Sequence, residues 1–451
     1  MSAKPTDLIQ GRAKRALQVG SLTSAVGGSY AWHALTRLFQ SADKNEQALF
    51  ALHLKNALRL VERSRELRGA FMKLVQMLSM RGDLLPSEVI DVLSVVQSSL
   101  PPMDSALIRG QLRAELGAWP EQLFAHFEPE AFAAASLGQV HRARLRNGRQ
   151  VVVKIQYPGV DKTVEQDLKN MQALLRVLTL LTRDILRQPF EMDEIYDEMA
   201  ARLHEELDYL HEAENIRRFR RLFADDDELI IPRVFPKFSS RRVLTMDYVD
   251  GYTFQAILAP GVDKDLKDWV AIKYFQITWR QIFDFGVLHT DPQPGNYLVT
   301  YHPKISMLDF GSVRIFPSAV RRSYLALARA IVERDEQTMA ECFVDLGFLD
   351  AEVDPAPLIQ IMYLIFEPVL EDRVYDPHDY HSAEKSMAVT ALSLEHRIFN
   401  APGHRLFLVR ALLGLEAYVQ QFRTITNWHR LFWECIERSE AAESNSPSAE
   451  V

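Results

Sequence analysis

The stretch that most constrains the fold of this chain is residues 139–156, QVHRARLRNGRQVVVKIQ. It holds two strand-like runs on either side of Asn147-Gly148. Asn-Gly is the strongest short signal for a tight β-hairpin, because both positions tolerate a positive φ angle. Segments whose apolar residues recur at helical spacing lie before and after it. The sequence therefore predicts an α+β fold with a small antiparallel sheet.

Changes in periodicity and composition divide the chain into five zones. These are a basic N-terminal arm (1–40), a helical extension (41–120), a small β-rich lobe with an inserted long helix at about 193–223 (121–250), a helical lobe (251–437) and a disordered tail (438–451). Two further strands of the small lobe are expected in ELIIPRVF (228–235) and RRVLTMDYVDG (241–251). The tail is predicted to be disordered because it has almost nothing to bury.

Composition excludes several classes of function. The formal net charge of −8 and the pI of about 5.9 argue against broad nucleic-acid binding, which needs a basic face. The two cysteines, Cys342 and Cys435, exclude a disulfide framework and favour a reducing, cytoplasmic compartment. No run reaches the roughly 18–20 apolar residues that span a bilayer. The basic arm is either an interfacial helix or a loosely packed segment, so peripheral membrane contact stays open.

A stiff loop, VLHTDPQPGNYLV (287–299), carries polar residues of catalytic type. Asp291 and Asn296 lie five positions apart, with two prolines and a glycine between them. Proline lacks the amide donor and restricts φ, so this segment is a shaped loop and not a helix. The following segment, NYLVTYHPKISMLDFG, reads as a short hairpin that ends with Asp309.

These residue types suit phosphoryl transfer. Lys154, on the second strand of the Asn-Gly hairpin, can meet the charge of a triphosphate. Asn296 and Asp309 offer the hard oxygen ligands that Mg²⁺ prefers. Asp291 can orient or deprotonate an attacking hydroxyl. The five-position spacing from Asp291 to Asn296 also matches the protein-kinase pattern H-R-D-L-x-x-x-N.

Together these motifs resemble the UbiB/AarF family of atypical kinase-like proteins, over nearly the whole chain. The segments that carry the resemblance are MKLVQMLSMRGDLLP (72–86), AAASLGQVHRARL (133–145), ELDYLHEAEN (206–215), LHTDPQPGN and LDFG. The resemblance implies a protein-kinase-like two-lobed fold with an N-terminal helical extension, and ATP with Mg²⁺ bound between the lobes. It also implies a link to ubiquinone production and lipid handling, often at membranes.

Residue roles follow from the same resemblance. Lys154 contacts nucleotide phosphates and pairs with Glu212, while Asp291 is the catalytic aspartate. Lys73 and Gln76 of the helical extension lie over the site and meet Glu206 and Asp208. On a regular helix Glu206 and Asp208 point to different sides, so both can face Lys73 only if the helix is distorted. Position 75 is valine where the family signature has glycine, which puts the docking of this helix in question.

The alanine-rich loop stands where protein kinases carry glycines. Its Cβ atoms limit how closely the backbone approaches phosphate, so nucleotide geometry is expected to differ from that of a typical kinase. The expected contacts there are Ala135, Ser136 and Gln139. Adenine is expected to meet the backbone at Asp247, Tyr248 and Val249, where the last strand leads into the helical lobe.

The substrate class follows from what comes after Asp309. A helix is expected to start near Ser318, which leaves no room for an activation loop or a peptide-docking platform. A small molecule or lipid, such as a ubiquinone intermediate, is therefore the expected substrate. Three functions remain open: an atypical kinase, an ATPase that moves or exposes lipid intermediates, and a nucleotide-binding pseudokinase scaffold. His378 and His381, in DPHDYHSAE, are interpreted as part of a polar loop and not as a metal site.

Overall fold

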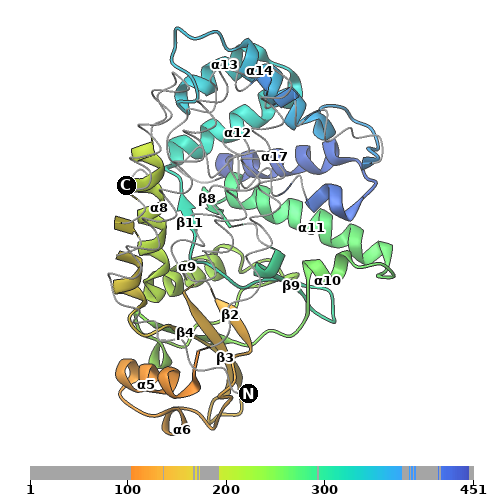
Figure 1. Ribbon diagram of the computed structural model, residues 1–451. Coiled ribbons are helices and arrows are strands. Elements are labelled where there is room, and N and C mark those ends of the chain that lie inside the picture. The colour runs from red at the N-terminus through yellow and green to blue at the C-terminus, as the bar shows by residue number, and fades with distance from the viewer. Residues whose placement is uncertain are drawn as a thin grey trace, which may run out of the picture. The chain divides into compact units, whose positions relative to one another are not determined.

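The computed structural model describes the C-terminal three quarters of the chain (Figure 1). The described residues are 103–445, apart from 136, 166–167, 170–171, 173–191, 292–293, 378–384, 386–387, 390, 393–414 and 416–417. The basic arm, Lys73, Gln76, Ser136 and both histidines of the 378–381 loop therefore lie outside the described residues. No helix in the described part of the chain is long and apolar enough to cross a bilayer.

The chain forms two compact units. The first comprises the described residues up to Ala213 together with Val234–Tyr248, and the second comprises Glu214–Arg233 together with the chain from Val249 onward. The chain therefore passes between the units three times. The first passage falls inside a helix, between Ala213 and Glu214, and the others fall between Arg233 and Val234 and between Tyr248 and Val249.

The first unit is built on an antiparallel sheet in the order β1-β3-β4-β6, with β2 paired to β3. Its strands are β1 (His126–Phe127), β2 (Ala133–Ala135), β3 (Gly138–Arg144), β4 (Gln150–Gln156) and β6 (Val243–Asp247). The predicted hairpin is present: Arg144 lies opposite Gln150, and Gly148 has a φ of 85°. The turn forms because glycine adopts this left-handed conformation without steric cost.

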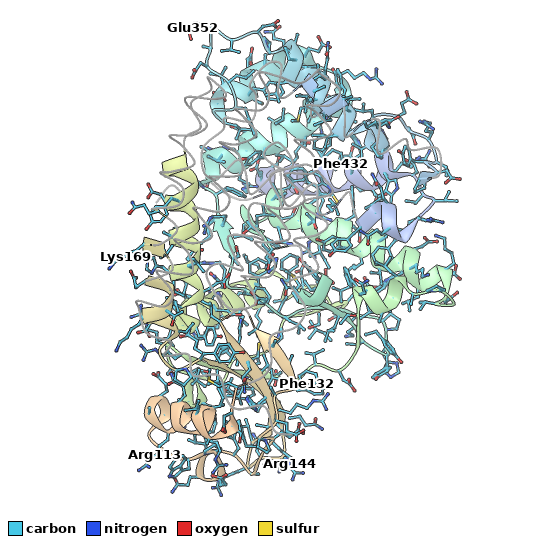
Figure 2. The ribbon with its side chains drawn as sticks, in the orientation of Figure 1. Arg113, Phe132, Arg144, Lys169, Glu352 and Phe432 are labelled. Atoms are coloured by element: carbon cyan, nitrogen blue, oxygen red, sulfur yellow. The ribbon has the colours of Figure 1, made fainter. Side chains whose placement is uncertain are left out.

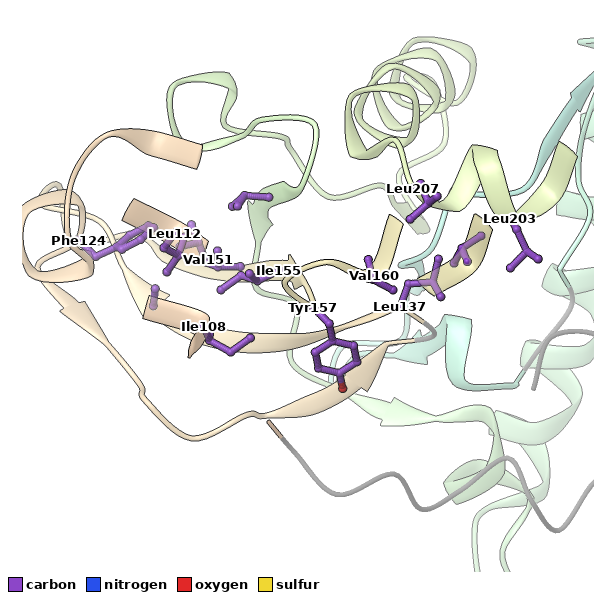
Figure 3. Close-up of a cluster of buried hydrophobic side chains, with 14 of the residues drawn as sticks. Ile108, Leu112, Phe124, Leu137, Val151, Ile155, Tyr157, Val160, Leu203 and Leu207 are labelled. Atoms are coloured by element: carbon purple, nitrogen blue, oxygen red, sulfur yellow. The ribbon is translucent and has the colours of Figure 1, made fainter. Parts of the chain in front are cut away.

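A hydrophobic core lies under this sheet (Figure 3). Val151, Val153 and Ile155 alternate along β4 and are fully buried. They pack with Ile108 and Leu112 of α5 (Ser105–Leu116), which begins where Asp104 caps the amide of Ala106 and is followed by α6 (Pro120–Leu123). Side chains alternate between the two faces of a strand, so burying the odd-numbered residues of β4 presents Lys154 on the opposite face.

The single helix predicted over about 193–223 is instead two helices, α8 (Met192–Glu206) and α9 (Tyr209–Leu222). Leu207 and Asp208 interrupt them. The Asp208 carboxylate accepts the amide hydrogens of Leu210 and His211, at 3.0 and 3.3 Å. A side-chain oxygen that takes up these first amide groups starts a new helix. The regular helix is thus interrupted between Glu206 and Tyr209. This is the kind of distortion that Glu206 and Asp208 would need if both were to face Lys73.

The second unit contains a four-stranded sheet in the order β5-β10-β9-β7 and a separate pair, β8 with β11. The strands are β5 (Leu229–Ile230), β7 (Tyr252–Thr253), β8 (Val287–His289), β9 (Tyr297–Val299), β10 (Ile305–Met307) and β11 (Val313–Ile315). The predicted hairpin before Asp309 is β9 and β10, which pair antiparallel. A 3₁₀ turn, η4 (Pro294–Asn296), leads into it.

One strand prediction is wrong. ELIIPRVF was expected in the small sheet, but β5 at its start pairs in parallel with β10 of the second unit. Only Val234, near its end, bridges to Met246 of the small sheet. Pro232 lies between the two paired parts, and a proline has no amide hydrogen to continue a ladder.

Helices make up most of the second unit. They are α10 (Phe254–Leu258), α11 (Lys264–Phe283), α12 (Ser318–Glu333), α13 (Glu336–Asp345), α14 (Ala356–Ile365) and α17 (Trp428–Asn445), with a 3₁₀ turn at Glu367–Val369. Aromatic rings join α11 to α17. Phe432, marked in Figure 2, is fully buried and lies 4.7 Å from Trp279 and 5.9 Å from Phe283, between ring centroids.

The C-terminal boundary predicted at residue 437 is also wrong, because α17 continues to Asn445. Its last turns are polar, and their partners come from another helix. Arg329 of α12 binds Glu440, with Nε 2.8 Å from Oε1, and Arg321 binds Glu443. Ser439, next to Glu440, is buried. Ion pairs with α12 thus stabilise a segment that has little apolar surface to bury.

Candidate functional site

Lys154 and Glu212 form a buried ion pair in the first unit. Lys154 lies in the middle of the sheet, opposite Val140 of β3 and Leu244 of β6. Its Nζ is 3.0 Å from Oε1 and 2.9 Å from Oε2 of Glu212, in the first turn of α9. The Lys154 and Glu212 side chains are only 11% and 3% exposed. The pairing that the family resemblance implied is therefore present, and it holds the lysine in one direction.

Tyr209 contributes to the same site. Its ring lies beneath the ammonium group, with Lys154 Nζ 5.0 Å from the ring centroid. Such a contact adds a favourable cation–π interaction, worth about 0.5–2 kcal/mol depending on exposure. The sequence carried no signal for this contact, because it depends on where α9 begins.

The acidic residues before Glu212 have different environments. Asp208 caps α9, and its Oδ2 lies 3.5 Å from Nε of Arg241. The backbone oxygen of Glu206 lies 3.4 Å from Nε2 of Gln156 on β4. Because Lys73 and Gln76 are outside the described residues, the predicted pairing with Glu206 and Asp208 stays a prediction.

The alanine-rich loop comes very close to the sheet. At Gly138 an added Cβ would lie 2.2 Å from the backbone oxygen of Ile155, so only glycine fits there. Ala135 is paired with Gly138 in the β2–β3 ladder. Alanines stand where protein kinases carry glycines in this loop, and Gly138 is the residue that lets β3 approach β4.

The expectation that the Gln139 side chain contacts phosphate is contradicted. Gln139 is 1% exposed, and both ends of its amide are bound internally. Oε1 accepts the amide hydrogen of Met103 at 3.0 Å, and Nε2 lies 2.9 Å from Nε2 of His141. His141 in turn contacts the backbone oxygen of Glu128 at 2.9 Å. Residue 139 faces inward because it lies near the start of β3, on the buried face of that strand.

The segment expected to meet adenine lies at the passage between the two units. Asp247 ends β6, and its Oδ1 lies 3.2 Å from Nη1 of Arg149. The Tyr248 amide donates to the backbone oxygen of Gln150 at 3.2 Å. An adenine contact through this amide would require that bond to break. At Val249 the chain re-enters the second unit.

Asp291 and Asn296 are joined directly in the second unit. Nδ2 of Asn296 donates to Oδ2 and to the backbone oxygen of Asp291, both at 3.1 Å. Because the amide nitrogen is taken up by Asp291, the oxygen Oδ1 is the atom of Asn296 that can serve a cation. These two bonds set the Asp291 carboxylate and the Asn296 amide side by side.

Asp309 lies beside Asn296 because the residue before it, Leu308, is bonded to Asn296. Leu308 donates its amide hydrogen to the backbone oxygen of Asn296 at 2.9 Å, which places Asp309 next to Asn296. Oδ1 of Asp309 accepts the amide hydrogen of Gly311 at 2.9 Å. The backbone oxygen of Asp309 accepts from Nε2 of His289, so that ring carries its proton on Nε2.

This donor set fits a magnesium ion. Mg²⁺ is bound in kinases by one or two carboxylates together with substrate phosphates, and not by a cage of protein ligands. Asp309 offers a charged carboxylate, and Asn296 offers a neutral amide oxygen held by its hydrogen bond to Asp291. Both are hard oxygen donors on the same small hairpin.

Sequence reasoning missed a group of buried tyrosines beside Asp291. The centroid of the Tyr274 ring lies 5.1 Å from that of Tyr297 and 5.4 Å from that of Tyr418. Burial, together with nearby groups that include the Asp291 carboxylate, raises the pKa of all three phenols well above the usual range. They therefore stay neutral. The hydroxyl oxygen of Tyr297 lies 3.4 Å from Nδ1 of His289.

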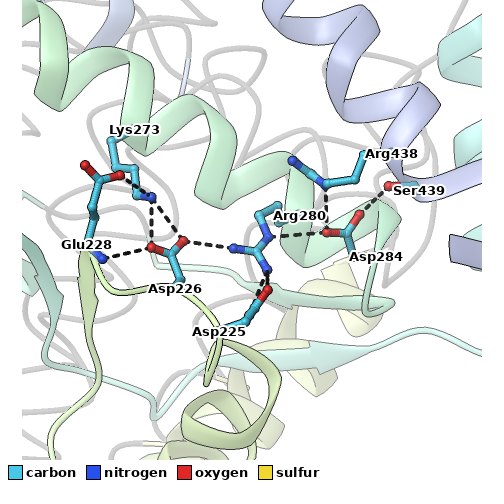
Figure 4. Close-up of polar contacts among 8 residues, drawn as sticks. All are labelled: Asp225, Asp226, Glu228, Lys273, Arg280, Asp284, Arg438 and Ser439. Carbon is cyan, nitrogen blue, oxygen red and sulfur yellow. Dashed lines mark hydrogen bonds and ion pairs between the residues drawn. The ribbon is translucent and has the colours of Figure 1, made fainter. Parts of the chain in front are cut away.

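A charged network after α9 was also missed (Figure 4). Asp226, whose side chain is 5% exposed, accepts from Nζ of Lys273 and from Nη1 of Arg280, both at 2.8 Å. Arg280 also reaches Asp284, with Nε 3.3 Å from Oδ2. Lys273 and Arg280 both belong to α11. The loop that follows α9 is therefore fastened to α11 within the second unit.

Comparisons with known proteins agree with this geometry. The model of the ABC1 atypical kinase-like domain matches residues 95–343. The chloroplastic Protein Activity of BC1 Complex Kinase 3 of Arabidopsis thaliana is 33% identical over 372 residues, which is 80% of this chain and 50% of that protein. The mitochondrial Atypical kinase COQ8 of Saccharomyces cerevisiae is 28% identical over 444 residues, or 96% of this chain and 86% of that protein.

A solved structure shares the fold as well. The complex of Rv3197 with erythromycin, from Mycobacterium tuberculosis, aligns with a TM-score of 0.63 and 25% identity over 88% of this chain and 98% of that chain. The chain spans about half the length of the chloroplastic relatives from Arabidopsis. The family and the kinase-like α+β fold expected from the sequence are confirmed. Since the family model covers more than half of its residues, this chain belongs to the ABC1 atypical kinase-like domain family.

Proposed function

We propose that this chain binds ATP with Mg²⁺ and acts as an atypical kinase or ATPase on a small or lipid substrate, in support of ubiquinone biosynthesis or lipid handling. The observation that carries the proposal is the arrangement of Asp291, Asn296 and Asp309 in the second unit. Their side chains lie on one loop and one hairpin, held by hydrogen bonds of 2.9 to 3.1 Å. A scaffold without chemistry would have no need to keep all three.

Each residue has a role in this proposal. Asp291 orients the attacking hydroxyl and takes its proton, while the hydroxyl oxygen bonds to the γ-phosphorus and ADP leaves; in an ATPase, water takes the place of the hydroxyl. Asn296 and Asp309 hold Mg²⁺, which when bound neutralises phosphate charge. Lys154, held by Glu212, contacts the nucleotide phosphates.

The chain after Asp309 supports a substrate other than a protein. β11 ends at Ile315, and α12 begins at Ser318 directly after Pro317. Protein kinases use a much longer segment here, with a phosphorylation site, to dock peptides. The described chain has only seven residues from Gly311 to Pro317 before that helix begins. A small molecule or a lipid head group needs no such platform.

The relatives support the same class. The yeast protein is named an atypical kinase, and the Mycobacterium protein is described in complex with erythromycin, a small molecule. The link to ubiquinone and to membranes remains part of this proposal, and the basic arm that would meet a membrane lies outside the described residues.

The test is ATP turnover by the purified chain, with and without vesicles that contain anionic lipid. We expect turnover that depends on Mg²⁺ and is lost in Asp291→Asn. Mass analysis of the lipids separates a kinase, which yields a phosphorylated lipid, from an ATPase, which yields only phosphate. Nucleotide binding with no turnover under any condition would favour the pseudokinase scaffold. Transfer of phosphate to generic proteins, insensitive to lipid, would contradict the substrate class.

A further inference from the structure

Asn215 is a buried polar residue that the proposed function does not use. It lies on α9, which Figure 1 labels, three positions after Glu212. Its side chain is buried, and the residue is 1% exposed. Its Nδ2 donates to the backbone oxygen of Phe310 at 3.0 Å. Its Oδ1 accepts from Nη1 of Arg218 at 3.3 Å. The two contacts together define which end of the amide faces the Phe310 carbonyl.

The carbonyl that Asn215 holds belongs to the peptide group between Phe310 and Gly311. The N–H of the same peptide group donates to Oδ1 of Asp309 at 2.9 Å. Asn215 therefore binds one side of a rigid, planar group, and the Asp309 carboxylate is bound by the other side. A hydrogen bond to the carbonyl also polarises the peptide, which strengthens the bond made by its N–H.

The neighbouring peptide groups are held by separate partners. His289 donates to the backbone oxygen of Asp309, and Thr290 donates its amide hydrogen to the backbone oxygen of Ser312 at 2.9 Å. The Phe310 ring is fully buried, with its centroid 5.0 Å from that of Phe219 on α9. Among these contacts, the orientation of the 310–311 peptide group depends on Asn215.

We propose that Asn215 is a positioning residue for the metal-binding carboxylate of Asp309. Through the 310–311 peptide group it sets the direction of the carboxylate before a cation arrives. This inference rests on the proposed function, because it assumes that Asp309 binds Mg²⁺. Residues that orient a metal ligand in this way typically change metal affinity about 10- to 100-fold when they are replaced.

The experiment measures Mg²⁺ affinity and not turnover. The full chain is held with a constant excess of ADP, MgCl₂ is titrated, and thermal stability is recorded. Asn215→Leu keeps the approximate volume but removes the donor. We expect the half-saturating Mg²⁺ concentration to rise by about 10- to 100-fold, while stabilisation by ADP in EDTA stays as in the wild type. Arg218→Met, which removes the partner of the amide oxygen, should shift it in the same direction.

A matched control separates positioning from general stability. Asn427 is also a helix-associated asparagine of the second unit, and its Oδ1 caps the amide of Arg430 at 3.0 Å in α17. Asn427→Ala should lower the melting temperature without moving the half-saturating Mg²⁺ concentration.

The outcomes distinguish the two levels of the argument. If the wild-type chain shows no Mg²⁺-dependent stabilisation with ADP, the proposed function fails. If the wild type responds but Asn215→Leu has the same half-saturating Mg²⁺ concentration, the positioning role is overturned and Asn215 only satisfies a buried carbonyl. Should Asn215→Leu not fold, an unchanged half-saturating concentration in Arg218→Met overturns it equally.

Discussion

The buried ion pair between Lys154 and Glu212 makes a quantitative prediction about stability. With side-chain exposures of 11% and 3% and two contacts near 3 Å, removal of one partner leaves a charge that water barely reaches. Breaking such a pair costs about 3–5 kcal/mol, whereas replacing both charges by apolar groups of similar volume is often neutral. We expect Lys154→Met and Glu212→Leu each to lower the free energy of unfolding by this amount, and the double variant to recover most of it.

Urea unfolding, followed by circular dichroism, measures the four corners of this double-mutant cycle. Arg242 is a more exposed control in the same unit. Its side chain is 40% exposed, and its guanidinium lies 2.9 Å from Oδ2 of Asp161 and 3.3 Å from Oε1 of Glu115. Arg242→Met should cost no more than about 1 kcal/mol. The reasoning is refuted if Glu212→Leu costs as little as Arg242→Met, or if the double variant is no more stable than the less stable of the two single variants.

The double variant also separates stability from nucleotide binding. A ligand that binds only the folded chain raises the melting temperature, and the rise grows with the logarithm of its affinity. Under the proposed function, the double variant should fold with near wild-type stability and yet gain little from Mg–ADP. Full stabilisation by Mg–ADP in that variant would remove Lys154 from the nucleotide site.

Three further predictions use other sites. Gly138→Ala places a Cβ 2.2 Å from a backbone oxygen of β4 and should lower the free energy of unfolding by about 1–3 kcal/mol or more. Gly110→Ala lies in α5 with open space around the added Cβ and should raise it by about 0.5–1 kcal/mol. Denaturant midpoints compare the two variants. Asp226→Asn should lower stability by about 3–5 kcal/mol because two buried cations lose their shared partner, while Asp225→Asn, at a side chain 73% exposed, should change it little. Burial lowers the pKa of His141 below 6.5 in the folded chain. The unfolded chain therefore binds a proton first, stability falls as pH drops below 6.5, and His141→Gln should flatten that slope in unfolding measured from pH 7 to pH 5.

The sequence alone determined the local features of this protein. The hairpin at Asn147-Gly148, the strand that carries Lys154, the β9–β10 hairpin before Asp309 and the helix start at Ser318 all agree with the structure. Each depends on neighbours within a few positions: turn residues that accept positive φ, alternation along a strand, or a proline that begins a helix. Such signals are written in consecutive residues, so a single sequence is enough to find them.

Partner choice was decided by tertiary structure. Several acidic residues precede and follow position 208, and the residues alone did not distinguish which of them meets Lys154; Glu212 does so because the chain breaks and α9 restarts at Tyr209. Gln139 looked like a phosphate contact until its amide was found bound to Met103 and His141.

The remaining errors have the same cause. ELIIPRVF joined the second unit because β10, some 75 positions later, offered a parallel edge, and α17 extended to Asn445 because α12, more than 100 positions earlier, supplied arginines. A periodic pattern shows that a segment has a face to bury or a charge to pair, but not which distant surface will meet it. That choice depends on contacts between residues far apart in the chain, and only the folded structure contains them.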